Sequence, residues 1–229
     1  MGKKIAKNGQ SITKLVHDVV ASNAAYEHAI VMGYANLSAL SRIIQQRLRS
    51  AGQHASVEAI HSALKRYRSM KRVEEVGAYR VLSRSSVTVM TDVIKAVFRS
   101  EKAEEILEKG MLISKKLIHI SKTSNALTLV VNGMSKQEVL STFSKYRNEV
   151  LELKDGLTLI IIHSPEEILR TPGCVEMIYR AISSAGINIE DTSSTYTDTL
   201  IVVKDADASK AFEEINLLIN FSKNRVRES

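Results

Sequence analysis

The stretch Leu157–Lys204, LTLIIIHSPEEILRTPGCVEMIYRAISSAGINIEDTSSTYTDTLIVVK, decides the fold of the chain. A β-branched run opens it, and a polar loop then leads to Pro172-Gly173. Apolar residues spaced three and four apart predict an amphipathic helix that ends at Gly186, because glycine tolerates the left-handed backbone after a helix. The runs Ile187–Ser193 and Thr199–Val203 predict two more strands. The pattern is therefore β-loop-α-β-β, with the loop at a helix N-terminus that offers unpaired N–H groups.

The chain before this stretch carries a weaker copy of the same pattern. From Ser86 onward, strand and helix signals alternate as β-α-β-β-α-β, the order of a ferredoxin-like fold with two helices on one face of an antiparallel sheet. The first strand, Val87–Phe98, is long, and we expect a break at Thr91-Asp92. The strand and helix after Asn125 parallel those after Asp198, which indicates an internal repeat. The second copy has no evident last strand, so we expect it to borrow one from the first copy or from a partner chain.

The N-terminal part predicts helices alone. Polar N-cap residues and apolar stripes place these helices at Ile12–Ala21, Ala24–Met32, Leu37–Ser50 and Val57–Ser69. The last two are joined by the short turn AGQHA, which resembles a helix-turn-helix with Val57–Ser69 as its recognition helix. Tyr79–Leu82 and Val87–Met90 predict a hairpin, which is either the wing of a winged helix or the lead into the next domain.

Positive charge is concentrated in the same N-terminal part. Up to Arg72 the chain has 12 Lys or Arg and 3 Asp or Glu, a net charge of +9 against +7 for the whole chain. This asymmetry suggests a separate domain that faces a polyanion, although a solvated basic surface also explains it. The polar face of the recognition helix suits a nucleic-acid groove. The residues predicted to contact DNA are Ser56, Glu58, His61, Ser62, Lys65, Arg66, Arg68, Lys71 and Arg72.

The sequence offers no pattern that indicates catalysis. Cys174 is the single cysteine, so neither a disulfide nor a cysteine-rich zinc site is expected, and a small buried hydrophobe is the preferred interpretation of it. No phosphate-binding glycine loop is present, and the six His residues lack metal-ligand spacing. No apolar run approaches the ~20 residues of a membrane span. We therefore expect a soluble cytoplasmic protein that is not an enzyme and uses no metal or cofactor.

Three motifs in and after the opening stretch resemble those of ACT domains, which are small βαββαβ ligand-binding modules. The motifs are T-P-G-C-V at Thr171–Val175, A-G-I-N-I at Ala185–Ile189 and D-T-L-I-V-V at Asp198–Val203. The resemblance extends to about Phe221 and is closest to the ACT domains of aspartate kinases. The preceding repeat resembles a divergent ACT domain more weakly and lacks a Pro-Gly before its first helix. With its helix-turn-helix, the whole chain is similar to prokaryotic, mainly archaeal, proteins described as predicted regulators of amino-acid metabolism.

The resemblance implies a ligand site, because ACT domains bind an amino acid at the interface of two domains. Gly173 would let the backbone approach a carboxylate, and the following helix N-terminus would donate N–H groups. Arg170 would add a bidentate contact, and Asn188 matches the position of a ligand-contacting Asn. The alternatives are that Asn188 satisfies a turn, that His163 is a strand-end polar residue and that Arg170 is solvated. The residues predicted to bind the ligand are His163, Arg170, Thr171, Pro172, Gly173, Cys174, Asn188 and Ile189.

Together these patterns predict an α+β chain in which a helical or winged helix-turn-helix domain precedes two tandem ferredoxin-like βαββαβ ACT repeats. The expected segments are residues 1–72 for the helical domain, 73–85 for a connector or wing, 86–155 for the divergent repeat and 156–229 for the ACT domain. The predicted function is a transcriptional regulator that binds DNA, senses an amino acid and forms a homodimer or larger homo-oligomer. A regulatory subunit that docks on a metabolic enzyme without binding nucleic acid is the alternative, and purely structural repeats are a third.

Overall fold

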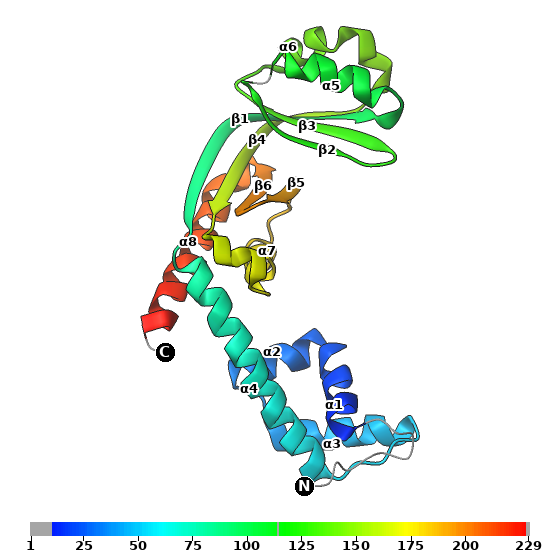
Figure 1. The fold of residues 1–229 in the computed structure, drawn as a ribbon, viewed down its shortest axis with the longest axis vertical. Coiled ribbons are helices and arrows are strands. Elements are labelled where there is room, and N and C mark those ends of the chain that lie inside the picture. Colours follow the sequence, from blue (N-terminus) through cyan, green and yellow to red (C-terminus); the bar gives the residue numbers. More distant parts are fainter. Residues whose placement is uncertain (1–10, 114, 228–229) are drawn as a thin grey trace. The chain divides into compact units, whose positions relative to one another are not determined.

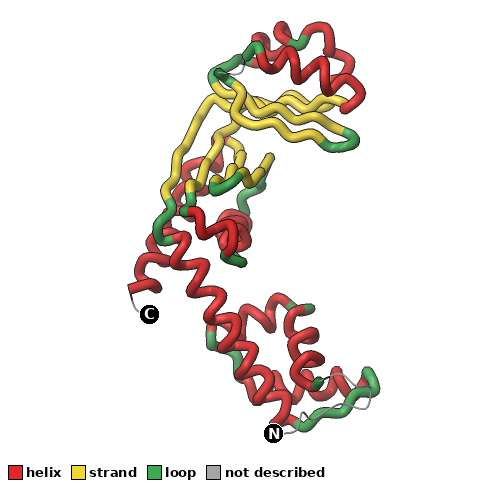
Figure 2. The backbone as a smooth tube through the Cα atoms, in the orientation of Figure 1, coloured by secondary structure: helices red, strands yellow, loops and turns green. Residues whose placement is uncertain are grey.

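The computed structural model describes residues 11–113 and 115–227, without the side chains of Ala24, His28, Met32 and residues 72–75. The chain divides into two compact units, Met1–Gly77 and Ala78–Ser229. The first is helical, and the second combines an antiparallel sheet with helices (Figures 1 and 2). Within the described ranges, no helix is both long enough and apolar enough to cross a bilayer.

The helical unit contains the predicted helices. They are α1 (Ile12–Ala21), α2 (Ala24–Met32), α3 (Leu37–Ser50) and the first part of α4 (Val57–Leu82). Ser11 and Asn36 cap α1 and α3 as expected, because their side chains accept hydrogen bonds from the backbone N–H groups three residues later, at 3.2 and 3.1 Å. Apolar residues from α1, α3 and α4, among them Val16, Ile44 and Leu64, close a core that excludes solvent.

Helix α4 is longer than the sequence predicted, and this removes the expected hairpin. It runs for 26 residues from Val57 to Leu82, so Tyr79–Leu82 is the end of a helix and not a strand or a wing. The four apolar side chains of Ala78, Tyr79, Val81 and Leu82 are buried in the core of the α/β unit. A short apolar run is compatible with either a buried strand or a buried helix end. In this structure Tyr79–Leu82 is helical and packs in the core.

The α/β unit is built on one six-stranded antiparallel sheet. Its strands lie in the order β2-β3-β1-β4-β6-β5. In chain order they are β1 (Ser86–Arg99), β2 (Leu117–Lys122), β3 (Ala126–Asn132), β4 (Val150–His163), β5 (Asp191–Thr195) and β6 (Asp198–Lys204). The helices that cover the sheet are α5 (Ala103–Met111), α6 (Lys136–Thr142), α7 (Cys174–Ser184) and α8 (Asp205–Arg227). Residues 187–190 were predicted to begin a strand but precede β5.

The two repeats are not tandem, because they share their long strands. The first half of β4 completes the first repeat and the second half opens the second repeat, so the expected boundary at 155/156 falls inside one strand. The first half of β1 pairs with the second half of β4, as in Val87 opposite Ile162. It therefore supplies the missing fourth strand of the second repeat. Of the two predicted sources of that strand, the first copy is the one found.

Each long strand bends at a bulge near its middle. In β1 the pairing with β4 shifts between Met90 and Val93, and Asp92 has a positive φ of 56°. In β4 the next shift lies around Gly156, whose φ of 64° favours glycine. Extra residues of this kind bend and twist a strand, so the sheet curls between its halves (Figure 1). The predicted break at Thr91-Asp92 is thus a bulge within a continuous strand.

All the helices of the α/β unit lie on one face of the curled sheet. In the first half, alternate side chains such as Ile94 and Phe98 pack with α5 and α6. In the second half, Ile160 and Ile201 pack with α7, α8 and the end of α4. The intervening residues, such as Leu159 and Val130, meet in a separate apolar cluster on the other face. Alternation with a period of two therefore gives the sheet two apolar faces.

Substitution of Leu82 tests the observed end of α4. Leu82 is fully buried, so Leu82→Ala is expected to lower the free energy of unfolding of the α/β unit by about 2–5 kcal/mol in a urea titration. Arg80→Ala, in the same turn but exposed, is the control and should change it by no more than about 0.5 kcal/mol. A Leu82→Ala protein as stable as the control would contradict the packing described for α4.

Candidate functional site

The predicted ligand loop follows β4 and contains a short 3-10 helix, Glu166–Arg170. Contacts with the β5–β6 turn and contacts within the loop itself hold it in place. The hydroxyl of Tyr196, in the β5–β6 turn, donates to Glu166 Oε1 at 2.8 Å, and this bond raises the pKa of Tyr196. The N–H of Ser164 donates to the carbonyl of Thr197 at 3.1 Å. Within the loop, Thr171 Oγ1 donates to the carbonyl of Glu167 at 2.7 Å.

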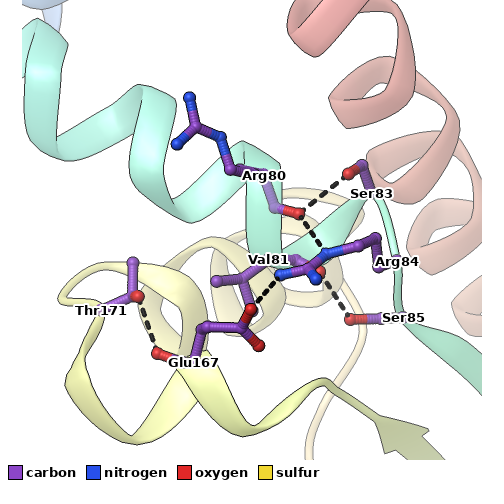
Figure 3. Close-up of polar contacts among 7 residues, drawn as sticks. All are labelled: Arg80, Val81, Ser83, Arg84, Ser85, Glu167 and Thr171. Atoms are coloured by element: carbon purple, nitrogen blue, oxygen red, sulfur yellow. Dashed lines mark hydrogen bonds and ion pairs between the residues drawn. The ribbon is translucent and has the colours of Figure 1, made fainter.

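The loop is also tied to the segment that ends α4 (Figure 3). Arg84 Nη2 lies 2.7 Å from Glu167 Oε1, and this ion pair lowers the pKa of Glu167. One residue later, Ser85 Oγ donates to Ser164 Oγ at 3.0 Å in a buried position. Figure 3 shows the Arg84 guanidinium turned toward the loop and that of Arg80 turned away from it. Neither Arg84 nor Glu167 was predicted as a site residue, because the two lie 83 residues apart in the chain and the predicted hairpin placed Arg84 in its turn.

The start of α7 has the geometry that the sequence predicted. Gly173 is the N-terminal cap residue with φ of 91°, and its carbonyl accepts from the N–H of Met177 at 3.0 Å. The N–H groups of the three residues before Met177 precede this first intrahelical bond and carry the positive end of the helix dipole. A Cβ on Gly173 would lie 3.9 Å from Cβ of Ala78, in ordinary contact. The end of α4 therefore packs directly beside the predicted ligand loop.

The exposed members of the predicted site are Arg170, Pro172, Gly173 and Asn188. Cys174 is different, because only 1% of its surface is exposed and it packs in the core with Ile178 and Leu82. Burial raises the pKa of its thiol to about 11, so the thiol is neutral near pH 7. Cys174 is therefore a core residue, which agrees with the preferred sequence interpretation and leaves only its backbone N–H for a ligand.

His163 joins three strands at the end of β4. Its Nδ1 lies 2.9 Å from Asp198 Oδ1 on β6, and its Nε2 lies 3.0 Å from Thr88 Oγ1 on β1. Both ring nitrogens are thus engaged by the protein. The geometry favours the interpretation of His163 as a polar residue that organises the strand ends beside the loop.

Asn188 and Ile189 lie at the other end of α7 from Gly173. Because an α-helix rises 1.5 Å per residue, the 11 residues of α7 separate the two places by about 16 Å. One amino acid cannot contact both within a chain. The predicted site is therefore divided into a loop part near Gly173 and a second part near Asn188.

The second part is a charged cluster between the two halves of the sheet. Asn188 Nδ2 donates to Glu190 Oε1 at 3.3 Å, and Lys154 Nζ lies 2.5 Å from Glu190 Oε2. Lys154 is also the main cause of a lowered pKa of Glu190. Lys95 Nζ donates to the Glu190 carbonyl at 3.0 Å and lies 2.9 Å from Glu152 Oε2. The sequence contains one signal of this cluster that was not used: Lys95 is a charged residue inside the apolar run VIKAVF.

The predicted DNA-contacting residues lie on α4 or, for Ser56, directly before it. Ser56, Glu58, Ser62, Lys65 and Arg66 are exposed, and His61, Arg68 and Lys71 are half-buried. Arg66 Nη2 donates to Thr13 Oγ1 at 2.9 Å, and Lys71 Nζ lies 3.5 Å from Glu27 Oε1. Arg68 lies beside Gly33. The side chain of Arg72 lies outside the described part of the chain.

The structure describes no metal centre. Among residues 11–113 and 115–227, His, Cys, Asp and Glu do not gather in any group of three that could hold an ion.

Comparisons with known proteins relate the chain to others by structure alone. No protein-family model matches the sequence, and no curated protein matches it. Solved structures of aspartate kinases and their regulatory subunits do match. The kinase from Synechocystis has a TM-score of 0.52 and 16% identity over 60% of this chain and 27% of its own. The regulatory subunit of the Thermus flavus kinase has a TM-score of 0.50 and 14% identity over 58% of this chain and 95% of its own. A structure of aspartokinase alpha and beta subunits has a TM-score of 0.51 and 13% identity over 59% and 97%.

These likenesses show that the α/β unit shares a fold with parts of aspartate kinases and with their regulatory subunits. The chain spans about a quarter to a third of the length of the full kinases. It spans nearly all of the Thermus flavus regulatory subunit and of the matched chain in the structure of alpha and beta subunits. At 13–16% identity the similarity is one of fold, so the residues that bind a ligand have to be argued from this chain's own geometry.

The chemistry of Cys174 gives a direct test of this site. Because its thiol is buried and its pKa is about 11, the native protein should react with iodoacetamide at pH 7.5 at least a hundredfold more slowly than the unfolded protein. Labelling is followed by mass spectrometry, with the urea-unfolded chain as the control. Rapid labelling of the native protein would show an accessible thiol at the start of α7 and contradict the core assignment.

Proposed function

We propose that the chain is a ligand-responsive transcriptional regulator in which the helical unit binds DNA and the ACT-like unit senses an amino acid. One observation carries the proposal. The helix that begins with the predicted DNA-contacting residues is the same helix whose last turns pack beside the predicted ligand loop. A ligand at the loop therefore acts on α4 without an intermediate element. The proposed role includes no catalytic step.

The loop part of the site suits the carboxylate of an amino acid. The first N–H groups of α7 offer donors that carry partial positive charge, and Arg170 is exposed beside them. Glu167 is held by Arg84 in an ion pair whose side chains are 56% and 50% exposed. Exposed ion pairs are screened by water and contribute little to stability, so a ligand with its own charges can displace this one. Displacement would free the end of α4 from the loop.

The helical unit supplies the proposed DNA contact. Ser62 and Lys65 lie one turn apart on the exposed side of α4, where they can reach a base edge and a phosphate. Arg66 and Lys71 lie on the same helix, with neighbours on α1 and α2, and add positive charge to it. A ligand that binds one arrangement of α4 better than another would favour that arrangement. The largest change in DNA affinity that it can cause is set by the ratio of its own affinities for the two arrangements.

The DNA assignment is tested by Lys65→Ala. Loss of one phosphate contact should weaken binding to genomic DNA fragments about tenfold near 100 mM salt and lower the slope of log K against log salt by about one. Lys115→Ala, an exposed lysine of the α/β unit, is the matched control and should bind like the wild type. Equal affinities and slopes for both variants in a gel-shift salt series would refute α4 as the DNA-binding helix.

The coupling through the loop is tested by charge reversal. Arg84→Glu should abolish the change in DNA affinity that an amino acid causes, because it replaces the Arg84–Glu167 attraction with repulsion. Combining it with Glu167→Arg restores the pair and should recover the response. The amino acid is first chosen by thermal shift against the common amino acids.

Three readouts separate the parts of this proposal. Calorimetry reports ligand binding, and gel shifts report DNA binding. The ratio of the DNA affinities measured with and without the ligand reports the coupling. A single variant that keeps the full response would contradict the proposed route through Arg84.

The regulatory subunits among the structural matches favour a second candidate. The Thermus flavus regulatory subunit is a chain of its own and is covered over 95% of its length, so this fold also occurs in a regulatory subunit that is separate from the catalytic chain. In that candidate the helical unit docks on an enzyme. It predicts that the purified protein carries no nucleic acid and that DNA fragments do not shift at 50 mM salt.

A further inference from the structure

The turn between α2 and α3 is shorter than the turn between α3 and α4. Four residues, Gly33–Asn36, separate α2 from α3, whereas the six residues 51–56 separate α3 from α4. Gly33 has a φ of 86°, and its N–H donates to the carbonyl of Ile30 at 3.2 Å. A turn of three or four residues that contains glycine is the usual connection in a helix-turn-helix. The α2–α3 pair therefore fits this motif better than the α3–α4 pair that the sequence indicated.

Apolar and aromatic contacts hold α2 and α3 together. Ile30 of α2 is fully buried in the same apolar core as Leu40 and Ile44 of α3. The guanidinium carbon of Arg47 on α3 lies 5.2 Å from the centroid of the Tyr26 ring on α2. These contacts use one side of α3 and leave its opposite side exposed to solvent.

The exposed side of α3 is polar and basic. Ser38, Arg42, Gln46 and Arg49 are exposed and follow one another at intervals of four, four and three residues, so they line one face of the helix. Ile43, which is 44% exposed, lies next to Arg42. The helix, LSALSRIIQQRLRS, contains neither Asp nor Glu. Among the described residues, the side chains of Arg42, Gln46 and Arg49 have no hydrogen-bond or ion-pair partner, so all three are available to a ligand.

The exposed face of α4 is less suited to the recognition of bases. Arginine, asparagine and glutamine form paired hydrogen bonds with the edges of guanine or adenine. Among the exposed residues of α4 up to Ser69, only Arg66 is of these types, and its Nη2 already donates to Thr13 Oγ1 at 2.9 Å. The exposed face of α3 carries three such residues.

We propose that α3, and not α4, is the helix that reads base edges in the major groove of duplex DNA. Arg42 would pair with a guanine and Gln46 with an adenine, and Ile43 would offer an apolar surface to a thymine methyl group. Arg42 lies in the N-terminal half of α3, where a recognition helix contacts base edges. Arg49, in the last turn, would contact a phosphate.

This inference rests on the DNA binding of the proposed function and divides that binding between two helices. Lys65 of α4 supplies an attraction to phosphates that does not depend on the sequence of the DNA, whereas α3 supplies the preference for one sequence. Affinity and sequence preference can therefore be changed separately.

Binding-site selection with the full-length protein tests this division. The protein selects duplexes from a random pool, and gel shifts then compare its affinity for the selected sequence with its affinity for a scrambled sequence. Arg42→Ala and Gln46→Ala should each lower the ratio of these affinities at least about fivefold, because each removes a paired contact that discriminates between bases. Both positions are exposed and alanine favours a helix, so both variants should keep the circular dichroism spectrum of the wild type.

Two further variants serve as controls. Arg47→Ala removes the same charge from the same helix, but Arg47 lies over the Tyr26 ring, so the ratio should not change. Lys65→Ala should weaken binding to both sequences equally. An RNA duplex of the selected sequence should not compete, because side chains cannot read the deep, narrow major groove of A-form RNA.

The outcomes separate this inference from the proposed function. If the wild type shifts no duplex, both are overturned. If the wild type binds DNA without selecting a sequence, or if Arg42→Ala and Gln46→Ala leave the ratio unchanged, reading by α3 is overturned and DNA binding stands. Equal competition by the RNA duplex, or an equal loss of the ratio in Arg47→Ala, would also overturn reading of the major groove by this face of α3.

Discussion

The α/β unit depends on the antiparallel ladder between β1 and β4. Each strand has 14 residues and passes through both halves of the sheet, so each repeat is completed by a strand that also belongs to the other. The bulges at Asp92 and Gly156 lie in the middle of this ladder and curl it. The two halves of the sheet therefore share their two central strands. Lys95 and Lys154 strengthen this link, because both contact Glu190 across the curl.

The position of the end of α4, Ala78–Leu82, follows from that ladder. Three residues, Ser83–Ser85, connect the end of α4 to the start of β1, and β1 lies next to β4, which leads into the ligand loop. The ligand loop therefore lies beside the residues that follow α4. There Arg84 donates a hydrogen bond to Glu167, and Ser85 donates one to Ser164. The apolar side of the helix end fills the same core as α7 and α8, so its orientation is fixed by burial more than by the exposed ion pair. A ligand need only alter this packing to act on α4.

Much of this fold was predictable from local patterns. Polar caps and apolar stripes located α1, α2 and α3, and the repeat predicted that the last strand of the second copy would be borrowed. The short apolar end of α4, Tyr79–Leu82, was mistaken for a strand, because four residues are too few for periodicity to distinguish a helix from a strand. Tandem repeats were expected because the residues before and after Gly156 each read as a strand, and only pairing shows that they are one. The ligand site stays a prediction: Gly173 lies at the N-terminus of α7, as the sequence indicated, whereas Asn188 lies about 16 Å away at the far end of α7. Arg84 and Glu190 depend on long-range contacts that no spacing in the sequence reveals.

The central claim is that the loop at 166–173 and the end of α4 respond as one element. Amide hydrogen exchange measured with and without a bound amino acid tests this most directly, because it reports each segment separately. The account predicts that a ligand which changes exchange in the loop also changes exchange at Ala78–Leu82, with β2 and β3 unaffected. A ligand that protects the loop and leaves Ala78–Leu82 unchanged would contradict it.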